Sequence, residues 1–357
     1  MNKKTLHLVY SLPNSKGIYK YIDKLLVKLG LQTTYRNNWK KTIDWTSPIK
    51  APYSISYNLL SVLSKEYYIK LYNIHERVKI ILSEDDIFLG HPCPDYKTKK
   101  LGTNSWSTFD KKQVTNQVIL NYPNDKRVFG IAPFNHSVNQ IGWAIPLYKQ
   151  LHNFIAICGD YWFDNLHKSP FAGCFNNISM LNMAIDTEQY PRLKKNFSPK
   201  GKRKFLYIGR VSEEKNIKEL EKIATLNPNF IGGYIADGEI KGWNKIADRA
   251  VLSTHFVQQY LLEYDFFITL STYDAQATTI LEAMSWGFIS VCTPQTGYTL
   301  EETYCFDIEN TKLNLEKIEV LQFLDEKVLQ ERIKHQDDLL NNKYSWDIFN
   351  NNTKKII

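Results

Sequence analysis

The sequence predicts an α/β protein with two doubly wound, Rossmann-like domains. Short apolar segments of strand length alternate with helical patterns along the chain, as in parallel sheets covered by helices. The alternation starts again after a polar, basic segment around residues 196–204. The chain also has 357 residues, which is more than one hydrophobic core usually organises. We therefore expect two domains joined by a basic hinge.

The first half begins with a strand, a turn and a helix. LHLVY at residues 6–10 is predicted to be a buried strand, and SLPNSKG at 11–17 a turn. Apolar side chains then recur at helical spacing on one face, at Ile18, Ile22, Leu25, Leu26 and Leu29. The further predicted strands are VKIIL at 78–82, DIFLG at 86–90, RVFGIAP at 127–133 and NFIAIC at 153–158. The polar stretch at 96–116 is predicted to be a loop.

The second half repeats this pattern. Its predicted strands are FLYIG at 205–209, NFIGGYI at 229–235, DFFITL at 265–270 and FISVCT at 288–293. Its predicted helices cover residues 211–226, 256–264 and 278–286, and Gly287 is expected to end the last of them.

The composition excludes several protein classes. Hydrophobic residues make up 43% and charged residues 23%, which is typical of a packed globular protein and not of a disordered chain. The longest apolar stretches are too short to cross a bilayer, and the N-terminus lacks a signal peptide core, so we expect a cytoplasmic protein. The five cysteines are scattered without a C-x-x-C pair, which indicates reduced thiols.

No metal-binding pattern is recognisable in the sequence. H-E-x-x-H, a phosphate-binding G-x-x-x-x-G-K-[ST] loop and a D-x-D clamp are all missing. The nearest acidic run, at residues 84–86, lies at the beginning of a predicted strand, which is the wrong end for a ligand. We expect no metal and no cofactor.

The net charge of +8 raises the question of an anionic partner. Much of the excess lies in residues 192–204, which suit a polyanion or an anionic membrane surface, although a solvated linker is the simpler interpretation. A second basic segment, at 35–45, contains Trp39 and Trp45. Tryptophan beside lysine is typical of a membrane interface, whereas buried tryptophans would leave only a solvated loop.

GRVSEEK at residues 209–215 is a candidate phosphate-binding segment. Gly209 ends a predicted strand, and Ser212 is placed to cap the helix that follows. Arg210 and Lys215 would then lie at the carboxyl end of a strand beside a helix N-terminus, which suits a diphosphate. The alternative is that both cations form surface ion pairs with the two glutamates of the segment.

STYDAQATTILEAMSWG at residues 271–287 contains two acids separated by seven residues. Asp274 follows a predicted strand, and Glu282 lies about one turn into the next helix. Carboxylates there can accept the paired hydrogen bonds that a ribose or sugar diol offers. Alternatively, Glu282 stabilises the helix dipole and Asp274 belongs to an ordinary turn.

Two histidines follow strands in the first half. His91 comes directly after DIFLG, and His136 follows RVFGIAP after two residues. The carboxyl end of a strand faces the ligand crevice of an open α/β sheet, so either histidine is a candidate for the active site. A lone histidine can equally have a structural role.

The segments at 209–215 and 271–287, in this order and in their strand–helix context, resemble the donor-binding half of glycosyltransferase family 4, whose retaining enzymes have the GT-B fold. Weaker similarities extend over most of the chain: SLPNSKGI to the family's glycine-rich loop, ISMLNMAIDTEQYPR at 178–192 to the segment before its linker, IADGEIKG at 235–242 to a glycine turn, and KYSWDIFNNNTKKII at 343–357 to its last helix. The resemblance implies two Rossmann-like domains whose parallel sheets face each other across a cleft. It places an acceptor-side domain at 1–195, a nucleotide-sugar domain at 196–340 and a returning helix at 341–357.

The resemblance also implies roles for individual residues. Arg210 and Lys215 would bind the donor diphosphate, Glu282 the ribose, and His91 the donor sugar. Asp274 stands where the family usually has a glutamate facing the transferred sugar, and the shorter side chain leaves the identity of that sugar open. The loops that contact the donor would include Gly17, Gly209, Ala277 and Thr278. Only Gly17 remains of the family's usual glycine pair.

The activity implied is the transfer of a sugar, with retention, from a nucleoside diphosphate sugar to a hydroxyl of a glycan or lipid-linked acceptor. Cell-surface glycan or polysaccharide synthesis is the expected context, in the cytoplasm or at the inner face of the membrane. Two alternatives remain: a sugar-nucleotide epimerase of the same fold, and a basic nucleic-acid-binding protein. Epimerases of this fold lack the acid pair in this context. For the second, few aromatic residues accompany residues 192–204, and we expect no nucleic-acid partner.

Overall fold

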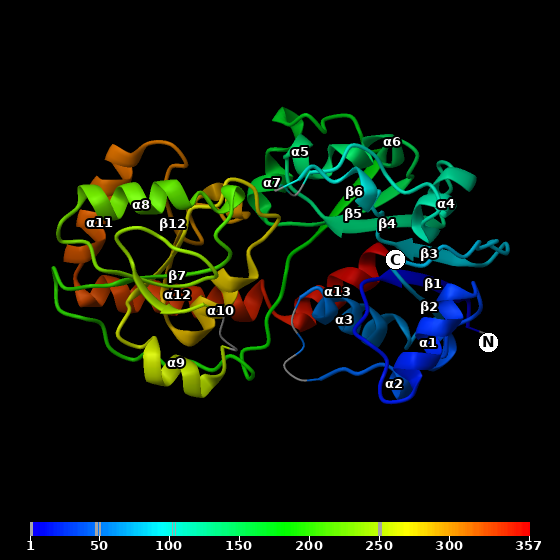
Figure 1. Ribbon diagram of the computed structural model, residues 1–357, viewed down its shortest axis with the longest axis horizontal. Helices are drawn as coiled ribbons and strands as arrows, with labels where there is room; N and C mark the ends of the chain where they lie inside the picture. The colour runs from blue at the N-terminus through cyan, green and yellow to red at the C-terminus, as the bar shows by residue number, and fades with distance from the viewer. Residues whose placement is uncertain (1–2, 47–48, 50, 102, 104, 249–251) are drawn as a thin grey trace. The chain divides into compact units, whose positions relative to one another are not determined.

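The computed structural model describes residues 3–46, 49, 51–101, 103, 105–248 and 252–357, which form two compact units (Figure 1). Unit 1 comprises residues 1–157, 165–181 and 350–357, and unit 2 comprises 158–164 and 182–349. Residues 158–164 and 182–195, which were assigned to the first domain from the sequence, therefore belong to unit 2. The predicted returning segment is divided, with 341–349 in unit 2 and 350–357 in unit 1.

Unit 1 is built on a parallel sheet of six strands in the order β2-β1-β3-β4-β5-β6. The strands are β1 (Thr5–Tyr10), β2 (Tyr68–Asn73), β3 (Ile87–Gly90), β4 (Val128–Pro133), β5 (Asn153–Ile157) and β6 (Asn177–Leu181). Within unit 1, every described strand except β2 and β6 corresponds to a predicted segment. The order reverses between β1 and β3, which places the topological switch point of unit 1 there.

The prediction of a strand at VKIIL, residues 78–82, is wrong. No strand forms there, and β1 pairs with β2 on one side and with β3 on the other. Ile80 and Leu82 are buried while Ile81 is 73% exposed, so this irregular segment packs part of its apolar content inward without joining the sheet.

Most helices of unit 1 connect one strand to the next along the chain (Figure 1). They are α1 (Tyr19–Lys28), α2 (Tyr35–Thr42), α3 (Tyr53–Leu63), α4 (Val114–Asn121), α5 (Val138–Ile141) and α6 (Ile145–Tyr148), with 3-10 turns η1 (Tyr96–Thr98), η2 (Gly142–Ala144) and η3 (Leu166–Lys168). The described part of the predicted loop at 96–116 is irregular apart from η1 and the beginning of α4.

Unit 2 has a second parallel sheet of six strands, in the order β12-β11-β10-β7-β8-β9. Its strands are β7 (Phe205–Ile208), β8 (Gly232–Ile235), β9 (Asn244–Ala247), β10 (Phe266–Thr269), β11 (Ile289–Cys292) and β12 (Tyr304–Cys305). Counted from β7, this is the Rossmann order 3-2-1-4-5-6, which reverses between β7 and β10. The α/β, two-domain fold predicted from the sequence is confirmed.

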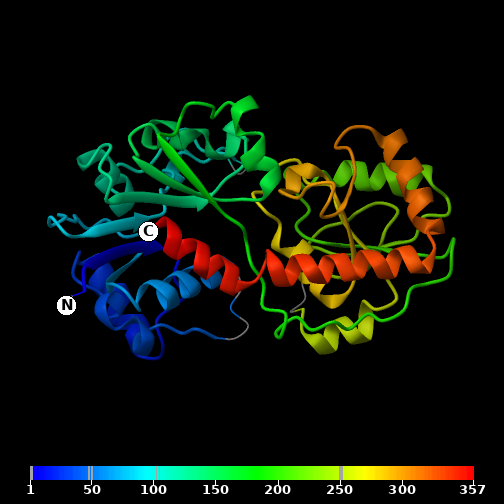
Figure 2. The ribbon, with the colours of Figure 1, turned by 180° about the vertical axis from the view of Figure 1, so that it is seen from behind.

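The helices of unit 2 are α7 (Asp160–Asp164), α8 (Ile217–Leu226), α9 (Thr254–Tyr260), α10 (Thr278–Trp286), α11 (Thr311–Phe323), α12 (Glu326–Asn342) and the beginning of α13 (Trp346–Ile356), with 3-10 turns η4 (Glu213–Lys215) and η5 (Pro294–Thr296). The predicted end of α10 is confirmed, since Gly287 has a positive φ of 95° that favours glycine. Seen from behind in Figure 2, α12 runs beside the sheet. The side-chain amide of Gln336 in α12 accepts a hydrogen bond from the Ser290 N–H and donates one to the Phe288 carbonyl.

The helix predicted at residues 211–226 begins later than expected. Residues 213–215 form the 3-10 turn η4, and Asn216 adopts a left-handed conformation (φ 51°) before α8 starts. Ser212 makes no capping hydrogen bond. Because of this break, Lys215 lies in a turn ahead of the helix and not within its first turn.

The basic segment at 192–204 lies within unit 2, and its charges are largely paired. Lys194 is buried with its Nζ 3.0 Å from Asp265, and buried Arg203 donates to the carbonyl oxygens of Leu321 and Leu324. Arg192, Lys200 and Lys204 form ion pairs with Asp337, Asp325 and Glu263. The structure therefore favours the simpler interpretation, in which this segment is part of the scaffold.

Candidate active site

The predicted donor-binding segments of unit 2 meet at its topological switch point. Gly209 and Arg210 follow β7 directly, and the loop 270–277 follows β10, which is the strand paired with β7. In open α/β sheets, ligands bind outside the carboxyl ends of the strands where the order reverses. The geometry of the fold thus brings two segments that are about 60 residues apart to one edge of the sheet.

Lys215 and Asp274 are in direct contact across the switch point. The Nζ of Lys215 forms an ion pair with Oδ2 of Asp274, and their side chains are 16% and 29% exposed. The backbone carries the same connection, since Thr272 donates its N–H to the carbonyl of Glu214 at 2.9 Å. The alternative role for Lys215 considered from the sequence was an ion pair with a neighbouring glutamate. The structure instead joins the two candidate segments through it.

Arg210 is placed differently from Lys215. Its side chain is 64% exposed and donates to Oε1 of Glu214 at 2.9 Å, so for Arg210 the surface ion pair considered from the sequence is present. The Arg210 carbonyl accepts a hydrogen bond of 2.7 Å from the hydroxyl of buried Tyr207. Its backbone is therefore fixed, while its guanidinium can exchange a glutamate for another anion.

The residues that hold the Asp274 loop were not predicted from the sequence. The Trp162 indole N–H donates to the Asp274 carbonyl at 2.6 Å, and its ring stacks on Tyr273. Gly159 donates its N–H to the Ala275 carbonyl, and a Cβ on Gly159 would stand 1.8 Å from the carbonyl oxygen of Gly297. The available signal was the GDYW sequence directly after the strand NFIAIC, at a strand's carboxyl end.

The remaining donor-site candidates of unit 2 lie on or beside α10. Ala277 precedes the helix and donates its N–H to the Thr296 carbonyl at 3.1 Å, and Thr278 is the first helical residue. Glu282 lies one turn further along, partly exposed. Burial, and secondarily the charge of Glu282, raise the pKa of Tyr190. Glu282 is thus close to Tyr190 and one helical turn from the Asp274 loop.

The candidates of unit 1 flank the switch point of that unit. Gly17 lies in the loop after β1 with a positive φ of 46°, and His91 follows β3 directly and donates its backbone N–H to Val9 of β1. The Nδ1 atom of His91 is 2.6 Å from the Pro92 carbonyl oxygen, which can only accept, so Nδ1 carries the proton. Desolvation lowers the pKa of His91 to about 4, and the ring is therefore neutral at pH 7.

His136, the competing histidine, lies three residues beyond the end of β4. Its ring packs edge-on against Phe134, with centroids 5.7 Å apart. Because β4 pairs with β3, both histidines lie at the same edge of the sheet of unit 1. His91 is the one beside the switch point.

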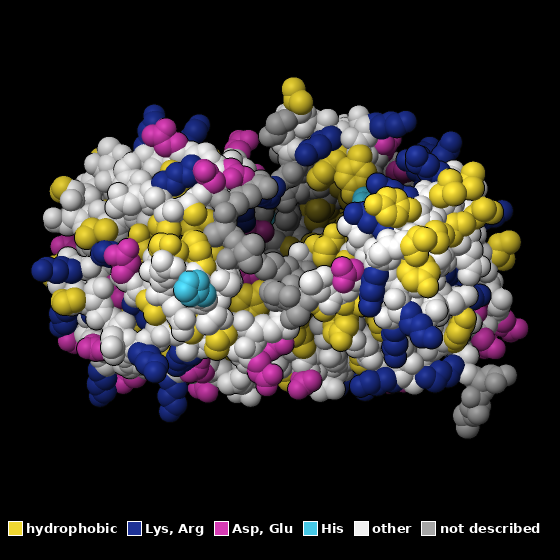
Figure 3. Space-filling view, turned by 60° about the horizontal axis from the view of Figure 1, so that its bottom comes forward, with side chains coloured by type: hydrophobic (Ala, Val, Ile, Leu, Met, Phe, Trp, Pro, Cys, Tyr) yellow, Lys and Arg dark blue, Asp and Glu magenta, His cyan; other side chains and the backbone are white. Residues whose placement is uncertain are grey.

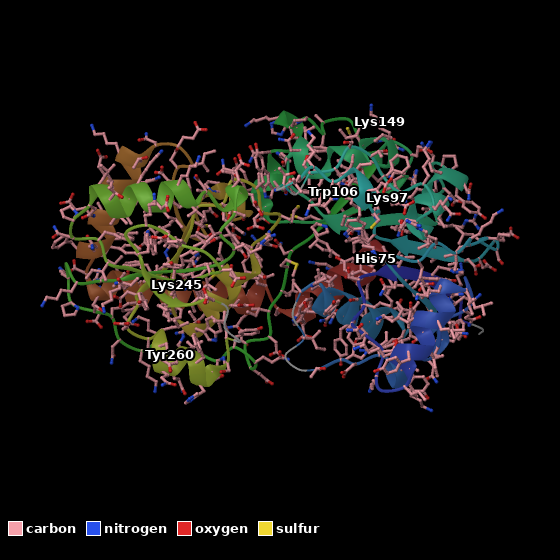
Figure 4. All side chains as sticks on the ribbon, in the orientation of Figure 1. His75, Lys97, Trp106, Lys149, Lys245 and Tyr260 are labelled. Carbon is pink, nitrogen blue, oxygen red and sulfur yellow. The ribbon has the colours of Figure 1, made fainter. Side chains whose placement is uncertain are left out.

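A partly exposed aromatic group occurs in the same unit. Tyr96 contacts His75 and Trp106 edge-on, at centroid distances of 5.7 and 6.2 Å, and the Lys99 ammonium lies 5.9 Å from the Trp106 ring. Figure 4 labels His75 and Trp106 on unit 1.

Within the described ranges, the structure contains neither a metal-binding cluster nor a membrane-spanning helix. No group of three or more His, Cys, Asp or Glu side chains is arranged to hold a metal ion in that part of the chain. Among the helices that the structure describes, none is both long enough and apolar enough to cross a bilayer.

The fold is similar to solved glycosyltransferase structures, although no protein-family model and no curated protein matches the sequence. The galactosyltransferase WaaB of the lipopolysaccharide outer core is 12% identical, with a TM-score of 0.57 over 99% of this chain and 98% of that one. A glycosyltransferase from Rickettsia africae is 13% identical, with a TM-score of 0.55 over 100% and 98%. A variant of S. aureus TarM, in complex with fondaparinux, α-GlcNAc-glycerol and UDP, is 14% identical at a TM-score of 0.51.

These similarities establish the GT-B fold of the chain. The TarM match covers 77% of this chain and 55% of TarM, so this chain spans little more than half of that protein's length.

Proposed function

We propose that this protein is a glycosyltransferase that takes a sugar from a nucleoside diphosphate donor. The observation that supports this most strongly is the contact between Lys215 and Asp274 at the switch point of a Rossmann-ordered sheet. A cation and a carboxylate placed there can bind the two ends of one ligand, a diphosphate and a sugar diol. The GT-B fold of the chain is consistent with such a donor.

In the proposed reaction, the bond between the anomeric carbon and the diphosphate oxygen breaks as the acceptor hydroxyl bonds to that carbon. Negative charge develops on the departing diphosphate. Lys215, with Arg210, would stabilise this charge where it forms, which lowers the barrier and does not merely tighten binding. A lysine ammonium has three N–H donors, so Lys215 can hold a phosphate oxygen and Asp274 together. The departing diphosphate can accept the acceptor's proton.

We further propose that Glu282 holds the ribose hydroxyls and that His91 contacts the transferred sugar. The neutral ring of His91, protonated on Nδ1, presents a lone pair on Nε2 that can accept a hydrogen bond from a sugar hydroxyl. Gly17, Gly209, Ala277 and Thr278 would let the backbone approach the donor. Retention of the anomeric configuration is part of this proposal.

For the acceptor we propose a glycan or lipid-linked sugar in cell-surface glycan synthesis. The partly exposed rings of His75, Tyr96 and Trp106 offer apolar faces against which a sugar ring can stack. The reaction is proposed to need no metal ion, because Lys215, Arg210 and the N–H groups at a helix terminus would neutralise the diphosphate. The proposed location is the cytoplasm.

The test is donor turnover by the intact protein with a panel of UDP-, GDP- and ADP-sugars. We expect the protein to release the nucleoside diphosphate from the sugars of one nucleotide, UDP, GDP or ADP. This release should decrease when Lys215 is replaced. Proton NMR of the first-formed product should show the anomeric configuration of the donor. The proposal is refuted if the protein epimerises the donor without releasing nucleotide, or if it binds only nucleic acid.

A further inference from the structure

The helix α1 shows the reverse of normal burial. Its apolar stripe consists of Ile18, Ile22, Leu25 and Leu29, which follow one another at steps of four, three and four residues. These side chains are 70, 37, 57 and 61% exposed. A surface helix of a globular protein normally turns such a stripe toward the core. Here the predicted helix is present, but four of the five residues of its predicted apolar face are turned away from unit 1.

The side of α1 that faces the protein carries Asp23 and the partly buried Leu26, the fifth residue of the predicted apolar face. Asp23 is the only buried residue of the helix, at 5% exposure. Its carboxylate accepts hydrogen bonds from the Ser15 hydroxyl at 2.5 Å, the Thr34 N–H at 2.6 Å and the Thr34 hydroxyl at 2.8 Å. These three bonds join the helix to the loop before it and to the beginning of α2. The outward direction of the stripe is therefore fixed by specific contacts.

The exposed surface of α1 is positively charged. Lys16, Lys20, Lys24 and Lys28 are all exposed, and the only acid in residues 16–31 is the buried Asp23. Lys20, Lys24 and Lys28 are spaced four apart and form a row beside the stripe, with Tyr21, 73% exposed, between row and stripe. Figure 3 shows hydrophobic side chains gathered beside Lys and Arg side chains on unit 1.

The segments that the sequence analysis considered for a membrane surface are less suitable. Trp39 is buried and packs edge-on against the partly buried Trp45, and Tyr35 is buried with its hydroxyl donating to Glu76. The aromatic rings of residues 35–45 thus belong largely to the interior. The charges of residues 192–204 are largely paired, as described above.

We propose that α1 is a membrane-docking helix, which lays its apolar stripe into the surface of an anionic lipid bilayer. Leucine and isoleucine side chains would enter the acyl boundary, Tyr21 would lie at headgroup depth, and the lysines would meet lipid phosphates. A second copy of this chain is the competing occupant. Twofold pairing of the stripe would bring two lysine rows together, and the repulsion between them disfavours a dimer.

Vesicle co-sedimentation tests the apolar stripe. The intact protein is expected to pellet with vesicles of equal parts phosphatidylglycerol and phosphatidylcholine and to remain in solution with pure phosphatidylcholine. The stripe variant is Ile22→Gln/Leu25→Gln/Leu29→Gln, and its matched control replaces three exposed apolar side chains of unit 2, Leu226→Gln/Val320→Gln/Phe323→Gln. The stripe variant should lose at least about 100-fold in partition constant, because each lost side chain removes several buried methylene groups. The control should change less than about threefold.

The lysine row is tested in the same assay. Each lysine near an anionic surface contributes roughly fivefold, so Lys20→Gln/Lys24→Gln/Lys28→Gln should lower the partition constant about 100-fold. Its control is Lys218→Gln/Lys222→Gln/Lys312→Gln, three exposed lysines of unit 2. Raising the salt from 0.1 to 0.5 M should weaken binding of the intact protein.

The outcomes separate the possible occupants of the stripe. Loss of vesicle binding in both α1 variants, with retained circular dichroism and monomeric behaviour, supports the inference. It is overturned if anionic vesicles do not bind the protein, if neutral vesicles bind it equally, or if either α1 variant binds as the intact protein does. A concentration-dependent dimer that the stripe variant abolishes would assign the face to a second copy. Vesicle binding needs no donor, so these results are independent of the proposed enzymatic activity.

Discussion

Lys215 should contribute more to donor binding than Arg210, although the sequence alone suggests the same diphosphate-binding role for both cations. Lys215 is 16% exposed and connects η4 to the β10 loop through Asp274. Arg210 is 64% exposed and already neutralised by Glu214. A cation that is shielded from water and held in place interacts more strongly with a diphosphate than one that is solvated and mobile.

The expected magnitudes follow from these environments. Losing a shielded, charge-assisted hydrogen bond costs about 1.5–3 kcal/mol, so Lys215→Ala should weaken UDP or donor binding roughly 10- to 150-fold. An exposed ion pair is worth about 0–1 kcal/mol, so Arg210→Ala should weaken it at most roughly fivefold. Lys215→Ala also leaves the Asp274 carboxylate unpaired beside the diphosphate. The loss should therefore be smaller when Asp274→Asn is already present.

Titration calorimetry with the nucleoside diphosphate measures these losses directly, and donor hydrolysis measures them in turnover. Lys218→Ala is the matched control, because Lys218 is an exposed lysine on the neighbouring α8. The reasoning is refuted if Lys215→Ala binds within about threefold of the intact protein, or if Lys218→Ala and Lys215→Ala weaken binding equally. It is also refuted if Arg210→Ala is the more damaging change.

Three further predictions concern metal, pH and stability. Donor turnover should persist in excess EDTA, and a complete loss that manganese or magnesium restores would contradict the proposed metal independence. The pKa of His91, ordinarily near 6.5, is lowered to about 4 in the folded state, so the folded state binds fewer protons than the unfolded one between these values. The free energy of unfolding should therefore keep its full value above pH 6.5 and fall by at most ~3 kcal/mol toward pH 4 in urea titrations. His91→Gln should lose this share of the pH dependence. An unchanged pH dependence in His91→Gln would argue against this role of His91. Asp265→Ala should destabilise unit 2 by about 3–5 kcal/mol, because it leaves buried Lys194 without its partner, and a loss below ~1 kcal/mol in chemical denaturation would show that the pair is not structurally important.

Local sequence patterns were sufficient for much of the sheet framework and for α10. β7, β10 and β11 are short apolar runs followed by a turn or a helical pattern, and such runs are buried on both faces of a parallel sheet. Gly287 was recognisable as the end of α10, because a helix that stops in a left-handed residue favours glycine. The two donor segments could be predicted to meet because parallel strands share their carboxyl ends.

Features that depend on distant residues could not be predicted in this way. Residues 78–82 have the apolar content of a strand, but β2 and β3 are the strands that pair with β1, and no local pattern shows which segments will pair. The apolar spacing of α1 predicts a helix and an apolar face, yet the direction of that face depends on Asp23, Ser15 and Thr34. Likewise, Trp162 supports the Asp274 carbonyl across more than 100 residues of sequence, and no local pattern indicates such a contact.

Thermal-shift measurement against nucleoside diphosphates and their sugars tests the proposed donor site most directly. A ligand that binds only the folded protein stabilises it by about 2.7 kcal/mol at 100 times its Kd. We predict that UDP, GDP or ADP, with its sugars, raises the melting temperature by several degrees, and that Lys215→Ala removes most of this rise while Lys218→Ala keeps it. No shift with any of these ligands at millimolar concentration, or an equal shift in Lys215→Ala, would contradict the assignment of the switch point of unit 2 as a nucleotide-sugar site.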